Sequence, residues 1–312
     1  MNNLILSSTP LRISFIGGGT DFREFYCKNN TYGQVISAAI NLRTYCILKK
    51  KIKTKIKSDQ KLFNNEIYNT NIYKSFSKFA KEQKVYDKYD VIFYSDIPNG
   101  SGLGTSSSFI LSLLKCFFKS IEKNFTNKEL INFSNYFESS LMKRPIGMQD
   151  AWGSQISGIK KIRFYKNRVD IKKIHKSKFT NFVNNNLFLY PINSFKSNKN
   201  ILNNIRKNII SNSTTNLLMQ MNELSNKAYK TILNDDFKSF LSILRDSHDI
   251  KSSYTKGVSN NTIEKSFTYL KSREVMPLKI LGAGGRGFIL FFCDKKNKLI
   301  NNNINYLDFK VV

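Results

Sequence analysis

The sequence predicts an α+β protein of two domains, the first covering residues 1–184 and the second residues 185–312. Strand and helix patterns alternate irregularly in the first domain, whereas the second carries long helices followed by a strand, a glycine turn and another strand. A glycine-rich loop near residue 100 lacks the spacing of a dinucleotide-binding turn, which argues against a doubly wound parallel sheet. At 312 residues, the chain is long enough for two hydrophobic cores of modest size.

The first strand is predicted in "TPLRISFIGGG", which ends in a glycine turn, and "QVISAAINLRTYCILKKK" predicts one or two further strands. In "KIKTKIK", residues 51–57, the lysines alternate with period two, which predicts the solvent face of a strand. "YDVIFYS" predicts a buried strand and "ILSLLKCFFKSI" an amphipathic helix. The chain near residue 100 is therefore expected to run from strand to glycine-rich loop to helix.

A second helix is predicted in "TNKELINFSNYFESSL", with Thr126 as N-cap and Glu129 completing a capping box. "KKIRFYKNRVDI" predicts a hairpin that turns at Lys166 and Asn167. These elements complete the first domain.

The second domain is predicted to begin with a strand in "NLFLYPI". Helical periodicity follows at about 214–233 and 237–250, and a third helix starts near Asn261. "LKILGAGGRGFILFFCD" predicts two strands around a glycine turn, and "DFKVV" predicts a last strand.

Composition excludes several classes of protein. No run of about 18 apolar residues exists, and the first ten residues lack the charged start of a signal peptide, so neither a membrane span nor secretion is expected. The four cysteines are scattered without metal or disulfide spacing, and the two histidines lie far apart. Zinc chemistry and a Ser-His-Asp triad are therefore poorly supported, and a reduced, cytoplasmic compartment is expected.

The net charge is +28, from 50 basic and 22 acidic side chains. Such an excess could indicate an anionic partner, either nucleic acid or a phosphorylated small molecule. It could also reflect coding bias, because Lys, Asn, Ile and Phe are abundant together, and we favour this for most of the lysines. No nucleic-acid-binding motif accompanies the charge, so no specific nucleic-acid partner is predicted.

The loop "PNGSGLGTSSSF", residues 98–109, has the composition of an anion cradle. Gly100, Gly102 and Gly104 can adopt positive φ and turn backbone N–H groups toward one point, and the helix that follows adds a partial positive charge. The hydroxyl side chains could reach a phosphate or Mg²⁺. A flexible loop before a helix capped by Thr105 or Ser106 would have the same composition, so this loop alone leaves both interpretations open.

Two further glycine clusters, "FIGGGTD" and "LGAGGRGF", each follow an apolar stretch. Each alone could be a hairpin or bulge, but three such loops in one chain favour a shared phosphate site. Acidic residues are scarce, so Glu138 on a helix and Asp150 in a loop broken by proline and glycine are candidate functional groups. Without other information, Glu138 is better explained as an exposed charge on a helix, and Asp150 as a residue that forms a turn.

The chain resembles the GHMP kinases, the superfamily of galactokinase, homoserine kinase and mevalonate kinase. "PLRISFIGGGTD", "PNGSGLGTSSS" and "KILGAGGRGF" are similar to its three motifs and occur in the same order across nearly the whole chain. Within the superfamily, "TPLRISFIGGGTD", "GMQDAWGSQISG" and "LKILGAGG" most resemble the bacterial D-glycero-D-manno-heptose 7-phosphate kinases. The resemblance implies an ATP- and Mg²⁺-dependent kinase. It also implies an N-terminal α+β domain with a left-handed β-α-β crossover and a ferredoxin-like C-terminal domain.

By position, the resemblance implies a role for each motif residue. Asp150 matches the catalytic base and Arg12 the basic residue near the reacting centre, while Ser106 and Glu138 match Mg²⁺ ligands. The residues matched to ATP binding are Pro98, Gly100, Ser101, Gly102, Leu103, Gly104, Thr105, Ser106 and Ser107. Those matched to substrate binding are Asp21, Gly18, Gly19, Gly282, Gly284 and Gly285. Lys143 and Arg144 lie close to Asp150 in the sequence and are candidates for holding the far phosphate of the acceptor.

The heptose kinases imply phosphorylation of the anomeric hydroxyl of a sugar phosphate, with the 1,7-bisphosphate as product. The expected partners are thus ATP and a small sugar phosphate, with no membrane and with the oligomeric state left open. The chain departs from the pattern at Thr105, Ala151 and Arg286, where many relatives have serine, glutamine and glycine. Arg286 could contact phosphate or narrow the site. The alternatives are a kinase of an unphosphorylated sugar, a basic nucleic-acid-binding protein on the same fold, and an inactive relative.

Overall fold

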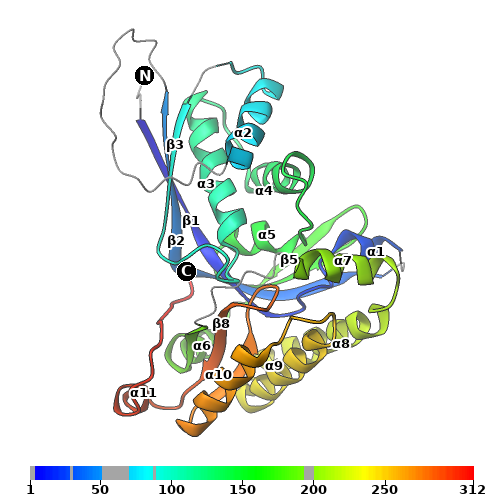
Figure 1. The fold of residues 1–312 in the computed structure, drawn as a ribbon, viewed down its shortest axis with the longest axis vertical. Helices are drawn as coiled ribbons and strands as arrows, with labels where there is room; N and C mark the ends of the chain where they lie inside the picture. The colour runs from blue at the N-terminus through cyan, green and yellow to red at the C-terminus, as the bar shows by residue number, and fades with distance from the viewer. Residues whose placement is uncertain (1–3, 29–30, 51–69, 87–88, 193–199) are drawn as a thin grey trace.

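Two antiparallel sheets organise the chain in a computed structural model that describes residues 4–28, 31–50, 70–86, 89–192 and 200–312 (Figure 1). The larger sheet contains five strands, β1 (Leu4–Ile16), β2 (Gly33–Lys50), β3 (Tyr89–Ser95), β4 (Ile159–Phe164) and β5 (Val169–Lys173). The smaller contains three, β6 (Leu187–Ile192), β7 (Met276–Ile280) and β8 (Gly287–Phe292). The structure is thus α+β, as predicted.

Strand β2 is the axis of the larger sheet. It pairs with β1 along one edge, and on the other edge its two ends take different partners. Residues 44–50 pair with β3, whereas residues 33–38 pair with β4. The segment predicted as one or two strands is therefore a single strand, and the hairpin predicted at Lys166 and Asn167 is formed by β4 and β5.

Helices cover the sheets on several sides (Figure 1). With the larger sheet lie α1 (Arg23–Lys28), α2 (Thr70–Glu82), α3 (Thr105–Ser120), α4 (Asn127–Tyr136), the π-helical segment η1 (Phe137–Leu141) and α5 (Gln149–Gln155). The rest of the chain adds α6 (Ser177–Asn186), α7 (Ile201–Ile210), α8 (Thr215–Leu233), α9 (Phe237–Ser252), α10 (Asn261–Ser272) and α11 (Lys296–Asn301). The capping box predicted at the start of α4 is present.

Two local predictions are wrong, those for β3 and for "DFKVV". Strand β3 was expected to be buried, but among the described residues it pairs with β2 alone, and its Ile92 and Tyr94 side chains are exposed. The helix predicted after the glycine-rich loop is present as α3, and 12 of its 16 residues are buried because it packs between β1, β2 and α4. "DFKVV" forms an isolated bridge between Val311 and Ile40 in place of a strand, because the chain there crosses both sheets without following either.

The predicted "KIKTKIK" strand lies outside the described residues. Along the chain, the domain boundary predicted between residues 184 and 185 falls within α6, which connects β5 of the larger sheet to β6 of the smaller. This boundary stays a prediction, as does the left-handed crossover. Among the described residues, no helix combines the length and apolar character that crossing a membrane requires.

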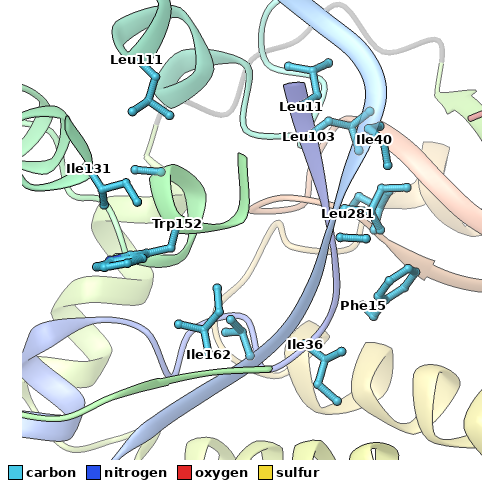
Figure 2. Close-up of a cluster of buried hydrophobic side chains, with 14 of the residues drawn as sticks. Leu11, Phe15, Ile36, Ile40, Leu103, Leu111, Ile131, Trp152, Ile162 and Leu281 are labelled. Carbon is cyan, nitrogen blue, oxygen red and sulfur yellow. The ribbon is translucent and has the colours of Figure 1, made fainter. Parts of the chain in front are cut away.

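The main hydrophobic core contains side chains from both sheets (Figure 2), and a second, smaller core lies wholly within residues 188–304. The main core includes Phe15 and Ile36 of the larger sheet, and it also includes Leu103 and Leu281, which lie in two of the glycine-rich loops. Both leucines are almost completely buried. Each loop is therefore held in place by an apolar side chain, which keeps its backbone at a fixed position on the surface of the core.

Candidate active site

The three glycine-rich segments meet at one place, between the two sheets. Backbone packs directly against backbone here: a Cβ atom on Gly102 would lie 2.6 Å from the Leu281 carbonyl oxygen, and one on Gly282 only 2.3 Å from the Gly102 Cα. Both glycines also have positive φ, so any side chain would clash and strain the turn. The first strand joins this contact because the Arg12 N–H donates to the Leu103 carbonyl at 3.0 Å.

The loops surround a cavity of about 450 Å³, a size typical of a small-molecule site. One part of its wall is polar and is formed by the glycine-rich segments together with charged side chains. Another part is apolar and includes Phe22 and residues of α7 and α8, among them Ile205 and Met221. The cavity can therefore accommodate charged phosphates beside a less polar group.

Asp150 and Arg12 form the principal ion pair of the cavity. Asp150 lies in the first turn of α5, and its Oδ1 accepts hydrogen bonds from Arg12 Nε at 3.1 Å and Nη2 at 2.7 Å. Arg12 Nη1 also donates to the Gly102 carbonyl at 2.8 Å. The Arg12 side chain is 4% exposed and that of Asp150 is 32% exposed, so the arginine is fixed while the carboxylate reaches the cavity.

Asp21 lies in the same cavity and is almost completely buried. Its Oδ1 accepts from Gly19 N–H and Gln149 Nε2, and its Oδ2 accepts from Gln149 N–H, all at 3.0–3.1 Å. Burial raises the pKa of Asp21 to about 6; the Gln149 hydrogen bond opposes this rise, and the Asp150 charge adds to it. Because Gln149 precedes Asp150, Asp21 fixes the start of α5 and thereby the position of Asp150.

Glu138 is held by two serines of the glycine-rich loop. Ser106 Oγ donates to its Oε1 at 2.8 Å, and Ser107 Oγ donates to its Oε2. Glu138 lies on η1, a π-helical segment of a kind often found at functional sites. Burial raises the pKa of Glu138, while the charge of Arg144 and both serine hydroxyls oppose the rise. The carboxylate was expected as either an exposed charge or a metal ligand, and its burial excludes the first.

Arg144 lies between these two predicted metal ligands. Its Nη1 donates to Ser106 Oγ and to Glu138 Oε1, the latter at 3.2 Å. The side chain is 41% exposed, so water reaches this pair. Arg144 and Asp150, which are close in the sequence, line the same cavity. The Arg144 guanidinium, however, contacts Ser106 and Glu138. Lys143, the other candidate for the acceptor phosphate, is exposed and does not line the cavity.

The oxygens of Ser106 and Glu138 suit a Mg²⁺ ion that is shared with a bound nucleotide. They do not suit a metal ion that protein side chains hold by themselves. A hydroxyl and a buried carboxylate supply two hard oxygen ligands, and Mg²⁺ in kinase sites completes its shell with phosphate oxygens and water. Among the described residues, no group of three acidic, histidine or cysteine side chains could hold a metal alone. The guanidinium of Arg144 also places a cationic group against both oxygens.

Of the residues predicted to bind nucleotide or substrate, some line the cavity and others do not. Gly100, Gly102, Gly104, Thr105 and Ser106 line the cavity, as do Gly18, Gly19, Gly282 and Gly284. Ser101, Leu103, Ser107 and Gly285 are buried behind the lining, and Pro98 is exposed. Ser101 supports the loop internally, since its hydroxyl bonds to the Thr105 hydroxyl at 2.9 Å and accepts from Leu103 N–H.

Sequence reasoning missed two buried lysines in the cavity wall. Lys251 Nζ donates to the Gly282 carbonyl, and Lys279 Nζ donates to the Phe15 carbonyl at 2.7 Å. Burial and the nearby Arg12 charge lower the pKa of Lys251 to about 8; burial together with the charges of Lys251 and Arg12 lowers that of Lys279 well below its usual value. A lysine within the apolar run "LKILG" is a signal that could have identified Lys279.

Comparison with known proteins places this site in a family. Residues 70–158 match the N terminal domain of GHMP kinases, a stretch that holds the glycine-rich loop, Glu138 and Asp150. This match assigns residues 70–158 to the GHMP kinase N terminal domain, and solved kinase structures share the fold of the whole chain. The predicted resemblance to the family and the predicted fold class are thus confirmed, and the comparisons support an ATP-dependent sugar kinase.

Individual relatives are similar over almost the whole chain. The D-glycero-alpha-D-manno-heptose 7-phosphate kinase of Campylobacter jejuni subsp. jejuni serotype O:2 is 26% identical over 311 residues, covering 94% of this chain and 91% of its own. The crystal structure of a candidate sugar kinase from Campylobacter jejuni has a TM-score of 0.72 at 23% identity, covering 99% of this chain and 96% of that one. A D-glycero-D-manno-heptose 1-phosphate kinase from Bacteroides thetaiotaomicron has a TM-score of 0.71 at 19% identity, with the same coverage.

Proposed function

We propose that this GHMP kinase transfers the terminal phosphoryl group of ATP to the anomeric hydroxyl of a sugar phosphate, with D-glycero-D-manno-heptose 7-phosphate as the acceptor. The observation that carries the proposal is the position of Asp150. Its carboxylate reaches the cavity beside the glycine-rich loop, and Arg12 occupies only one of its two oxygens. The whole-chain similarity to a heptose 7-phosphate kinase supports the choice of acceptor.

In this mechanism, Asp150 Oδ2 accepts the proton of the acceptor hydroxyl while Arg12 holds the carboxylate in place. The sugar oxygen then bonds to the terminal phosphorus of ATP, the bond from that phosphorus to the bridging oxygen breaks, and ADP leaves. Because the transferring group spreads negative charge over its oxygens, the Arg12 guanidinium and the backbone N–H groups of the loop stabilise it. A general base of this kind contributes about 10²- to 10⁴-fold in rate.

Ser106 and Glu138 would hold Mg²⁺, which neutralises charge on the nucleotide phosphates when bound. Both oxygens face the cavity and are already positioned by mutual hydrogen bonding. The apolar wall of α7 and α8 suits the less polar face of a sugar ring. Asp21 lines the same cavity and can accept a hydrogen bond from a sugar hydroxyl when ionised.

The test is ATP consumption with a panel of sugars, each supplied with and without its terminal phosphate, and including manno-heptose 7-phosphate. Phosphorus NMR of the product should show a new anomeric phosphate on the heptose 7-phosphate. If an unphosphorylated sugar is turned over faster than the heptose 7-phosphate, the alternative of a kinase for an unphosphorylated sugar would be the correct one. Absence of ATP consumption with every sugar would reject the proposed activity.

A further inference from the structure

Arg286, in the third glycine-rich segment, lies directly over the second. A Cβ atom built on Gly100 would lie 2.1 Å from Arg286 Nη2 and 2.5 Å from its Cζ, so the guanidinium is in contact with the Gly100 backbone. Arg286 and Gly100 both line the cavity. The side chain therefore extends from the turn between β7 and β8 across to the loop that precedes α3.

The charge of Arg286 has no acidic partner among the residues that the structure describes, where no hydrogen bond or ion pair to its side chain is found. The other two arginines of the cavity differ: Arg12 is paired with Asp150 and Arg144 with Glu138. A guanidinium offers five donors in a planar fork that matches phosphate oxygens. Arg286 thus retains its whole donor set for a group that enters the cavity.

A different arginine packs against each end of the glycine-rich loop. Arg12 packs against Gly104, with its Cγ 3.1 Å from a Cβ built there, and it carries Asp150. Arg286 packs against Gly100, at the other end of the same turn. In the proposed mechanism phosphoryl transfer takes place beside Asp150, which Arg12 holds near Gly104, so an anion bound by Arg286 at Gly100 would occupy the other end of the glycine-rich loop.

We propose that Arg286 binds the non-transferred phosphates of the nucleotide and closes the phosphate cradle from the third segment. The inference rests on the proposed function, because it takes the ligand to be ATP. It assigns Arg286 to the nucleotide and not to the phosphate of the acceptor. ATP and ADP share the phosphates that Arg286 binds, so the binding of both should depend equally on Arg286. The binding of adenosine, which has no phosphate, should not depend on it.

The experiment measures dissociation constants for ATP, ADP and adenosine by calorimetry, with MgCl₂ and without a sugar. The variants are Arg286→Ala and Arg286→Lys, with Arg245→Ala, at an exposed arginine on α9 outside the cavity, as the matched control. We expect Arg286→Ala to raise the dissociation constants for ATP and ADP by about tenfold or more, because losing a hydrogen bond to a charged group changes binding by about this factor. Arg286→Lys should recover part of the loss, and adenosine binding and the control should match the wild type.

Four outcomes would overturn the assignment. Unchanged binding of both nucleotides would remove Arg286 from the nucleotide site, and weakening of ATP alone would place it on the transferred phosphate. Equal weakening of adenosine, with a lower Tm, would show a role only in loop structure. A raised KM for a phosphorylated sugar alone would assign Arg286 to the acceptor. If the wild type fails to bind ATP, the proposed function itself fails, which is distinct from every outcome in which only the variants differ.

Discussion

Arg12 donates two hydrogen bonds to a single oxygen of Asp150, Oδ1, at 3.1 and 2.7 Å. No hydrogen bond to Oδ2 is found among the described residues, although the side chain lies at the cavity. A carboxylate held in this way is fixed in orientation by one oxygen and can accept a proton with the other. Arg12 Nη1 also donates to the Gly102 carbonyl, so one side chain holds both Asp150 and the glycine-rich loop.

The first prediction concerns this base. Asp150→Asn should lower kcat by about 10²- to 10⁴-fold, because the amide cannot accept the hydroxyl proton. The dissociation constant for ATP should stay within about twofold, because no hydrogen bond joins the Asp150 side chain directly to the glycine-rich loop in the described part of the chain, and Arg12 links the two. Single-turnover kinetics and calorimetry measure the two quantities, and a variant with the wild-type kcat would show that another group is the base.

The second prediction concerns the metal ligands. Ser106→Ala and Glu138→Gln should each raise the Mg²⁺ concentration required for half-maximal activity, since each removes or neutralises a hard oxygen ligand. Mn²⁺ titration followed by electron paramagnetic resonance, with nucleotide present, measures metal binding without turnover. Ser139→Ala on the same π-helical segment is the matched control, because within the described residues Ser139 Oγ bonds to the Asn135 carbonyl and the Ser140 hydroxyl, away from Glu138 and Ser106. An unchanged metal dependence in both variants would place the metal elsewhere.

Arg144 is the subject of the third prediction. If it binds the far phosphate of the acceptor, Arg144→Ala should raise the KM for a phosphorylated sugar several-fold and leave the KM for its unphosphorylated counterpart unchanged. Its contacts with Ser106 and Glu138 allow a different result, a changed Mg²⁺ requirement with both KM values unaffected. Steady-state kinetics with paired sugars separates the two, and the second result would withdraw Arg144 from acceptor binding.

Short motifs could be predicted from the sequence because they carry their own geometry. Asp150, Glu138 and the glycine-rich loop were identified together, and the structure brings them to one cavity with Arg12. Their chemical roles stay predictions. Helices with regular periodicity, such as α8 and α9, were also found within a few residues of their ends.

The remaining features depend on packing between distant segments. The contact of Arg144 with Ser106 requires a positive φ at Lys143 and the π-helical turn, and local propensity predicts neither. Burial of Lys251 follows from the meeting of α9 with the third glycine-rich segment. The exposure of β3 follows from its place at an edge, which depends on which strands pair with β2.

The fourth prediction follows from the raised pKa of Asp21. Burial raises this pKa to about 6, so the carboxylate is ionised at pH 7.5 and becomes protonated as the pH falls through about 6. A protonated carboxyl accepts sugar hydroxyls less well, so the acceptor KM should rise below pH 6 while the ATP dissociation constant changes little. The KM of Asp21→Asn should be high and should lack this dependence on pH. A wild-type acceptor KM that is flat from pH 5 to 8 would contradict the assignment.

The fifth prediction concerns stability and Lys251. Its pKa in the native state is about 8, whereas an unfolded lysine titrates near 10.4, so between these values the unfolded state binds more protons. The free energy of unfolding of the wild type should therefore rise relative to that of Lys251→Met as the pH increases through this window, by about 3 kcal/mol in total. Below pH 8 the difference between the two proteins should be constant.

Chemical denaturation of both proteins at pH 7, 9 and 10.5 measures this change. Groups distant from Lys251 titrate alike in the two proteins and cancel in the difference, whereas the pKa of Lys279 is less strongly lowered once the Lys251 charge is removed. The loss of the hydrogen bond to the Gly282 carbonyl adds a contribution that does not depend on pH. Lys238→Met, at an exposed lysine on the same helix, should show no such trend. A difference between wild type and Lys251→Met that stays constant up to pH 10.5 would mean that Lys251 is solvated in the native protein, and that the contact between α9 and the third glycine-rich segment is open in solution.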